Sequence, residues 1–262
     1  MRLAEWFLWL IIYSAAGWIM ETAVCSIAKK KFVNRGFLNG PLCPVYGFGA
    51  LICILVLQNR TGNIALLFFA GMALTSALEY ITSVILEKLF NAKWWDYSER
   101  RFNIHGRVCL KNAVAFGVLS VVLIKLIHPF TAGITAGLSH DVLLITAAAA
   151  FAAVMTDLAF TVSHLIGLNG RLKEFQLAFD AFGRRYKKRA DELRASFLAS
   201  FEQSEMYTER MKRRFEAVRA QSRRHLKAYP KLKHIKYADA WRRFKTKIAE
   251  TKKETKRTKE NK

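Results

Sequence analysis

Residues 64–85 read IALLFFAGMALTSALEYITSVI and contain a single charged side chain, Glu79. An α-helix rises about 1.5 Å per residue, so about 20 apolar residues cross a hydrocarbon core of about 30 Å. Other segments share this character, and the shortest of them carries Gly47 and Gly49. The five predicted membrane helices cover residues 3–27, 43–57, 64–85, 109–127 and 142–166.

These segments are predicted to be helices surrounded by lipid. Backbone polar groups cannot remain unpaired in a bilayer, and long apolar runs without alternation satisfy them as helices. The alternative is a set of buried core helices in a soluble protein, but such helices usually show a polar face, which these segments largely lack. The sequence therefore predicts an all-α, polytopic membrane helix bundle of about five transmembrane helices.

The composition divides the chain into an apolar part and a basic part. Hydrophobic residues make up 52% of the chain, yet its formal net charge is +22. Residues 171–262 contain 29 Lys and Arg against 12 Asp and Glu, a net charge of +17, which leaves +5 for the rest. We expect a transmembrane helical domain over residues 1–168, basic amphipathic cytoplasmic helices over 169–249 and a disordered tail over 250–262.

The distribution of basic residues predicts the orientation in the membrane, because loops rich in Lys and Arg remain in the cytoplasm. The basic loops follow the first and third helices and carry Lys29, Lys30, Lys31, Arg35, Lys88, Lys93, Arg100, Arg101 and Arg107. With five helices the N-terminus is then outside and the C-terminus in the cytoplasm. Lys125 fits least well, at the outer end of the fourth helix.

Three acids fall well inside the predicted membrane helices, away from their outermost residues, where a charge costs about 2.5–3.5 kcal/mol on insertion scales. They are Glu21, Glu79 and Asp157. Glu21 lies eight residues before Lys29, and Glu79 lies nine residues before Lys88, so both are expected at similar depths, about 12–13 Å from those charges. Glu21 and Glu79 are candidates for a functional polar site, whereas a structural role is favoured for Asp157.

A short pattern, Gly-x-(Leu/Val)-Cys, precedes both the second and the fourth helix. It covers residues 40–43 and 106–109. We hypothesise that the first two helices and the next two are copies of one hairpin in the same orientation, as in transporters built from parallel repeats. A site would then lie between Glu21 and Glu79, and Arg35, Asn39, His105 and Arg107 are close enough in sequence to line the same cytoplasmic vestibule.

The sequence contains no motif typical of catalysis or nucleotide binding. Gly-x-Ser-x-Gly, His-Glu-x-x-His and the phosphate-binding Gly-x-x-x-x-Gly-Lys-(Ser/Thr) are absent, and the six histidines have no metal-ligand spacing. We therefore expect no enzyme activity, no catalytic residue, no metal and no cofactor. An ATP-driven step would require another chain.

The stretches GWIMETAVCSIAKKKFVNRGFLNGPLCPVYGFGAL (17–51) and LEYITSVILEKLFNAKWWDYSERRFNIHGRVCL (78–110) resemble the ABC-transporter type IV (CmpB-like) membrane permease family. The resemblance covers roughly residues 5–128 and excludes the fifth helix and the basic tail. It implies a transport permease of the bacterial cytoplasmic membrane, with a separate ATPase subunit as a partner, and it adds Asp96 to the polar-site candidates. The residues carried over are Gly17, Glu21, Arg35, Gly36, Phe37, Asn39, Gly40, Pro41, Tyr46, Gly47, Glu79, Trp94, Trp95, Asp96, Tyr97, Asn103, Gly106 and Arg107.

Aromatic residues mark two predicted contacts with the membrane surface. Trp94 and Trp95, in an aromatic and charged loop, suit the lipid headgroup region. After Pro230, Trp241 and Phe244 belong to an apolar stripe beside many Lys and Arg residues, which is typical of an interfacial amphipathic helix. We expect the tail to bind anionic lipids, while an aromatic stripe between Phe175 and Phe201 suits a partner helix, including one from a second copy of the chain.

The alternative function is a non-transporting membrane anchor whose tail binds lipid, a partner protein or, less favoured, nucleic acid.

Overall fold

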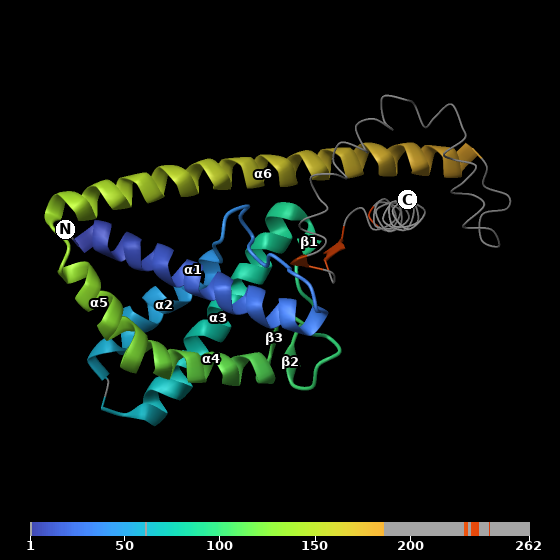
Figure 1. The fold of residues 1–262 in the computed structure, drawn as a ribbon. Coiled ribbons are helices and arrows are strands. Elements are labelled where there is room, and N and C mark those ends of the chain that lie inside the picture. Colours follow the sequence, from blue (N-terminus) through green and yellow to red (C-terminus); the bar gives the residue numbers. More distant parts are fainter. Residues whose placement is uncertain (1, 61, 186–227, 230–231, 236–240, 242–262) are drawn as a thin grey trace, which may run out of the picture. The chain divides into compact units, whose positions relative to one another are not determined.

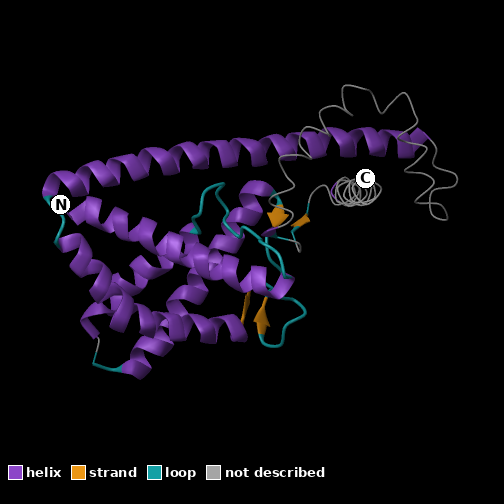
Figure 2. Ribbon diagram, viewed as in Figure 1, coloured by secondary structure: helices purple, strands orange, loops and turns teal. Residues whose placement is uncertain are grey.

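The computed structural model describes residues 2–60, 62–185, 228–229, 232–235 and 241 (Figures 1 and 2). The described chain is mostly helical, which confirms the predicted all-α class. Two-stranded pairings join β1 with β4 and β2 with β3. The elements in chain order are α1 (Arg2–Lys29), α2 (Pro44–Leu57), η1 (Gln58–Arg60), α3 (Ile64–Phe90), β1 (Ala92–Lys93), β2 (Asn103–Ile104), β3 (Val108–Cys109), α4 (Leu110–Val122), η2 (Leu123–Ile127), α5 (His128–Ala136), α6 (His140–Arg185) and β4 (Lys233–His234).

Four helical stretches are long and apolar enough to cross a membrane: Leu3–Lys29, Ile64–Phe90, Leu110–Ala136 and His140–Glu174. The remaining predicted span, residues 43–57, corresponds to α2, an apolar helix of 14 residues. At about 1.5 Å per residue α2 is about 21 Å long, shorter than the hydrocarbon core. The long apolar helices agree with the prediction of about five membrane helices.

The chain divides into two compact units. The first comprises Met1–Leu89, Lys93–Val162 and Lys227–Leu232, and the second comprises Phe90–Ala92, Ser163–Leu226 and Lys233–Lys262. The apolar core of the first unit joins α1, α2, α3 and η2. Its buried members are Trp9, Tyr13, Ala50, Cys53, Ile54, Leu57, Leu67, Leu123 and Ile124.

The second unit contains the C-terminal part of α6 and the segment around β4. The backbone N–H of Ile235 donates to the carbonyl oxygen of Asn91 over 2.8 Å. His234 and Trp241 are buried, with ring centroids 6.2 Å apart. Burial lowers the pKa of His234 to about 4, so its imidazole is neutral at physiological pH.

The fourth predicted helix does not end at residue 127. The helix continues through a π-helical turn, Leu123–Ile127, and through α5 to Ala136. Pro129 lacks an amide proton, and in a regular α-helix its ring would meet the carbonyl group of Lys125. The wider π turn, in which the His128 N–H donates to the carbonyl oxygen of Leu123, accommodates the proline without ending the helix. The predicted position of Lys125 at a helix end is therefore wrong, since Lys125 lies in the middle of this stretch.

The fifth predicted helix, 142–166, is also longer than expected. It begins at His140 and continues as α6 to Arg185, past Gly167 and Gly170. Glycine inside a helix costs about 1 kcal/mol relative to alanine, which is insufficient to end a helix by itself. Residues 186–227 and 242–262, which include most of the predicted basic helices and the predicted disordered tail, lie outside the described residues.

Candidate functional site

The carboxylate of Glu21, on the last turns of α1, is bound by two side chains. Its Oε1 atom accepts a hydrogen bond of 2.7 Å from the Tyr46 hydroxyl, and Oε2 lies 3.4 Å from Nε of Arg35. Gly17, one turn before Glu21, leaves room for Tyr46: a Cβ atom there would lie 2.4 Å from Cβ and Cγ of the tyrosine. The absence of a side chain at Gly17 thus lets Tyr46 approach α1, and the Tyr46 hydroxyl holds the Glu21 carboxylate between α1 and α2.

Glu79, just past the middle of α3, is buried, with 7% of its surface exposed. Its Oε1 atom accepts a hydrogen bond of 3.3 Å from the hydroxyl of Tyr97, and Asn112 of α4 lies close enough to interact with the carboxylate. Among the described residues, Oε2 has no partner with hydrogen-bond geometry. A buried carboxylate oxygen without a hydrogen bond destabilises the folded state. A purely structural role does not require such a cost, so Glu79 is a candidate for a functional role.

The two acids belong to one group, here called the acid cluster and defined by Glu21, Arg35, Tyr46, Glu79 and Tyr97. Glu21 acts electrostatically on both Glu79 and Tyr97. Burial raises the pKa of Tyr97, and the neighbouring carboxylates of Glu79 and Glu21 raise it further. The Tyr97 hydroxyl therefore keeps its proton and serves as a donor to Glu79.

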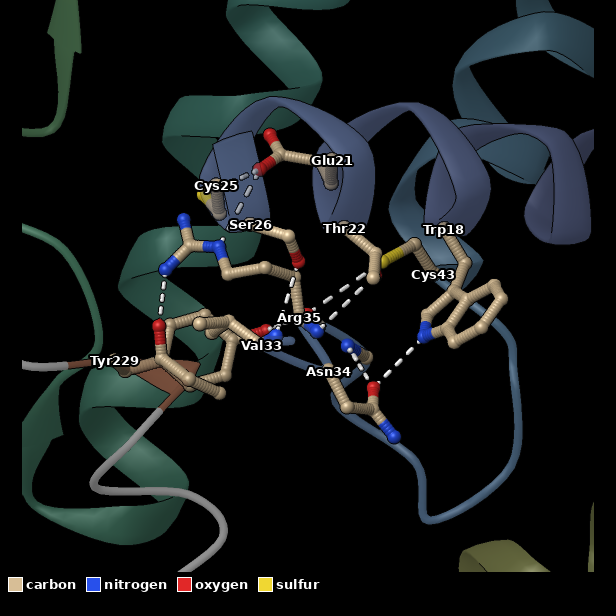
Figure 3. A network of polar contacts seen from close by, with 12 residues as sticks. Trp18, Glu21, Thr22, Cys25, Ser26, Val33, Asn34, Arg35, Cys43 and Tyr229 are labelled. Carbon is tan, nitrogen blue, oxygen red and sulfur yellow. Dashed lines mark hydrogen bonds and ion pairs between the residues drawn. The ribbon is translucent and has the colours of Figure 1, made fainter. Parts of the chain in front are cut away.

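Arg35 connects the acid cluster to a segment near the C-terminus (Figure 3). Besides Glu21, its guanidinium group donates to the carbonyl oxygen of Ala228 and lies 4.9 Å from the ring centroid of Tyr229. The hydroxyl of Tyr229 donates in turn to the Arg35 carbonyl oxygen over 2.8 Å. The backbone N–H of Arg35 donates to the hydroxyl of Thr22 over 3.4 Å, so the loop after α1 is held from both sides.

Asn39, also predicted for this site, binds elsewhere. Its backbone N–H and its amide nitrogen each donate to Oδ1 of Asp157 over 2.9 Å, and the N–H of Gly40 donates to Oδ2 over 2.7 Å. Thr161, one turn after Asp157, donates to the same carboxylate over 3.2 Å. These contacts join the loop before α2 to α6 and agree with the structural role expected for Asp157.

Replacing Asp157 with alanine is expected to detach this loop from α6, because three donors lose a charged acceptor. Each hydrogen bond to a charged group contributes about 1.5–3 kcal/mol, less at this partly exposed position. Limited proteolysis of the full chain in detergent should then cleave the loop of residues 31–43 faster. The matched control is Thr156→Ala, which removes an exposed hydroxyl bonded only to the Ala152 carbonyl oxygen; equal cleavage of both variants would contradict the role of Asp157.

The remaining polar-site candidates lie in two local arrangements. Nδ1 of His105 and the hydroxyl of Tyr80 form a hydrogen bond of 3.0 Å. The guanidinium of Arg107 lies 2.5 Å from a carboxylate oxygen of Glu87 and 5.6 Å from the Tyr80 ring centroid. Asp96 accepts from the backbone N–H and hydroxyl of the nearby Ser98, a turn that shapes its own loop. The predicted vestibule is therefore divided: of the seven candidates, Glu21, Glu79 and Arg35 lie in the acid cluster.

The aromatic residues expected at the membrane surface are placed differently. Trp94 is 4% exposed and packs against Phe37 and Tyr229, with ring centroids 5.1 Å apart in each case. The indole N–H of Trp95 donates to the Arg107 carbonyl oxygen over 2.9 Å. Trp241 is also 4% exposed, and Phe244 lies outside the described residues. The position of these aromatic residues relative to the lipid headgroups stays a prediction.

Sequence reasoning did not assign roles to the partners of the two acids. Tyr46 and Asn112 each follow the cysteine of the Gly-x-(Leu/Val)-Cys pattern by three residues. This shared spacing was the feature of the sequence that could have identified them as partners of the two acids. Tyr46 contacts Glu21 and Asn112 lies beside Glu79, so the two positions would correspond to each other if the hairpins were copies. The contribution of Tyr229 had no such signal, because it comes from a distant part of the chain.

Comparison with known proteins adds one finding. Residues 8–162, more than half of the chain, match the family described as "Putative ABC-transporter type IV". The match extends beyond residue 128 into α6, so the expectation that the resemblance excludes the fifth helix is wrong. No curated protein and no solved structure matches the chain.

Proposed function

Because the chain belongs to this family of ABC-transporter type IV membrane proteins, we propose that it is a permease subunit whose acid cluster is the polar site for the transported ion or solute. The single observation that carries the proposal is the electrostatic interaction of Glu21 with the buried Glu79, inside a helical bundle whose core is mostly apolar. Glu79 is 7% exposed and keeps one carboxylate oxygen without a hydrogen-bond partner among the described residues.

The charge of the acid cluster favours a cation as the ligand. The acid cluster holds two carboxylates and one guanidinium, because Arg35 contacts Glu21 and is also shared with Ala228 and Tyr229. Acids in low dielectric repel each other, and a bound metal cation, a protonated amine or a proton would relieve that repulsion. Tyr46 and Tyr97 supply hydroxyl oxygens beside the two acids.

The partners follow from the same proposal. The chain carries no phosphate-binding loop, so a separate ATPase subunit would supply the energy of an ATP-driven cycle. We place the chain in a bacterial cytoplasmic membrane, with the N-terminus outside and the C-terminus in the cytoplasm, from the distribution of Lys and Arg. Anionic lipids are the proposed partners of the basic tail, and a second copy of the chain is a further one.

A specific contact favours the alternative function, a membrane anchor that presents its basic tail to lipid or a partner. Ala228 and Tyr229, next to the basic tail segments, bind Arg35 directly. In this alternative, the acid cluster holds Arg35 in place for the tail and binds no ligand. The two functions differ in whether the carboxylates respond to added solutes.

Neutralising the acids is expected to abolish ligand binding. Thermal unfolding of the full chain in detergent would be measured with sodium, potassium, magnesium, calcium and manganese chlorides and with ethylammonium chloride. A ligand present at about 100 times its dissociation constant stabilises the folded state by about 2.7 kcal/mol. We expect at least one of these cations to stabilise the wild type and to lose that effect in Glu21→Gln and in Glu79→Gln.

Asp141→Asn is the matched control, because it makes the same chemical change at an exposed acid in the first turn of α6. It should respond to the cation as the wild type does. If no cation stabilised the wild type, or if stabilisation were equal in all variants, the acid cluster would not be a cation site. A cellular phenotype that ignores both glutamine variants but disappears on deletion of residues 171–262 would favour the anchor.

A further inference from the structure

A second buried polar group lies on the N-terminal half of α1, apart from the acid cluster. His128, the first residue of α5, is 2% exposed, and its Nδ1 atom lies 2.8 Å from the hydroxyl of Tyr13. Tyr13 is itself 3% exposed. The contact joins α1 to the helix that continues from α4, in a stretch where the other buried side chains are mostly apolar.

The other ring nitrogen of His128 has no partner. Among the described residues, Nε2 is buried without a hydrogen bond. If Nδ1 donates to the Tyr13 oxygen, Nε2 is a free lone pair inside the protein; if Nδ1 accepts, Nε2 carries an unsatisfied N–H. In the first tautomer, Nε2 can therefore accept a proton.

Two side chains of α1 would stabilise an imidazolium at this position. The ring of Trp9 meets the His128 ring nearly at a right angle, with centroids 4.8 Å apart, a distance at which a cation over the face of an indole is attracted. Burial disfavours the charged form of the ring, and Glu5, one turn before Trp9, acts against this with its opposite charge. Thr135 links the two, since it accepts from the Trp9 N–H over 3.0 Å and lies 3.3 Å from Oε1 of Glu5.

The backbone at this point is irregular in a way that places His128. The π turn Leu123–Ile127 ends at His128, and Pro129 follows it. Such turns add a residue to one turn of helix and are often found at functional sites. Here the turn positions the imidazole toward Tyr13 and Trp9 on α1.

We propose that His128, with Tyr13, Trp9 and Glu5 around it, is a proton-binding site that is separate from the acid cluster. Tyr13 and Glu21 are eight residues apart on α1, which corresponds to about 12 Å along the helix axis. Among the described residues of α1, two titratable side chains act on His128: Glu5 through its charge and Tyr13 through its hydrogen bond. Lys125, on the preceding turn, is exposed. Uptake of a proton at Nε2 creates a charge pair with Glu5 and strengthens the contact between α1 and α5.

Tryptophan fluorescence tests this proposal, because an imidazolium in contact with an indole quenches its emission. The full chain in lipid nanodiscs would be titrated between about pH 4 and pH 8.5, a range that includes the ordinary histidine pKa of about 6.5. The chain has six tryptophans, so the difference between the wild type and Trp9→Phe isolates Trp9. We expect this difference signal to fall on acidification in a one-proton transition.

Two variants identify the group that titrates. His128→Gln should remove the transition, and Glu5→Gln should move it to lower pH, since the opposite charge is lost. A transition that persists in His128→Gln, or a Trp9 signal that is constant over the whole range, would overturn the proposal. If His128→Gln does not fold, an unchanged midpoint in Glu5→Gln would overturn it equally.

Discussion

Replacing Gly47 with alanine is expected to destabilise the protein by about 1–3 kcal/mol, the usual range for an overfilled, well-packed contact. Gly47 is buried on the first turn of α2, against α1. A Cβ atom at this position would lie 2.2 Å from Oγ of Ser14 and 2.5 Å from the carbonyl oxygen of Leu10. The Leu10 oxygen belongs to the backbone of α1, so the two helices would have to separate.

This separation has consequences beyond one side chain. The contact between α1 and α2 is the most extensive between two elements of the described chain. Without a hydrophobic driving force between helices in lipid, close packing of small residues supplies much of their association. The same close approach supports the hydrogen bond from the Cys43 N–H to the Ser14 carbonyl oxygen, 2.9 Å long, which fixes the start of α2.

Thermal unfolding in detergent, followed by size-exclusion chromatography, measures the effect. Gly133→Ala is the matched control: it is the same substitution in a helix, at a position where a Cβ atom would have no neighbour within 4 Å. We expect Gly133→Ala to unfold at the wild-type temperature or slightly above it, because alanine is the better helix former. Equal midpoints for Gly47→Ala and Gly133→Ala would show that α1 and α2 do not approach so closely.

Membrane helices could be predicted because their signal is local. The run 64–85 contains its own evidence, and the structure extends it only to α3, Ile64–Phe90. The predicted end at residue 127 was wrong because His128 and Pro129 resemble a helix stop, and the π turn that absorbs the proline has no signal in a hydrophobicity pattern. The predicted end at 166 was wrong for a related reason. The chain becomes polar after Gly167 and Gly170, but neither the glycines nor the change in polarity interrupts α6.

The candidate site could be predicted in part. The similar depth expected for Glu21 and Glu79 comes from their spacing to Lys29 and Lys88 and stays a prediction, whereas their electrostatic interaction in the structure agrees with placing them in one site. Which loop residue contacts which acid does depend on it. Asn39 was grouped with Arg35 because they are four residues apart, yet it binds Asp157, which is more than a hundred residues away in sequence.

The hypothesis of two similar hairpins stays a prediction. Each hairpin places an acid beside a residue three positions after its cysteine, Tyr46 for Glu21 and Asn112 for Glu79. The connecting loops differ, because the second contains the antiparallel pair β2–β3, with Asn103 opposite Cys109. A common origin would explain why two acids lie in corresponding helices, while the differing loops explain why Arg35 has no equivalent contact with Glu79 in the described chain.

Arg35→Ala is expected to have the second large effect, a destabilisation of about 1.5–3 kcal/mol, the range for a hydrogen-bonded charged group. The Arg35 and Glu21 side chains are 23% and 30% exposed, so solvent screening keeps the value below that of a fully buried pair. The substitution removes the cation of the acid cluster and leaves the repulsion between Glu21 and Glu79 without compensation. It also removes the donor to Ala228 and the cation beside Tyr229.

A double-mutant cycle separates these contributions. In a Glu21→Gln background the charge repulsion is already relieved, so Arg35→Ala should cost less than it does in the wild type; the difference is the coupling between the two residues. Arg35→Lys should rescue only part of the stability, because a lysine ammonium is a point charge and cannot reproduce the planar fork of contacts to Glu21 and Ala228. Arg101→Ala, at an exposed arginine of the loop before β2, is the control and should be neutral. Identical costs of Arg35→Ala in both backgrounds would mean that Arg35 stabilises the chain through Ala228 and Tyr229 alone, and the acid cluster would then hold two uncompensated carboxylates.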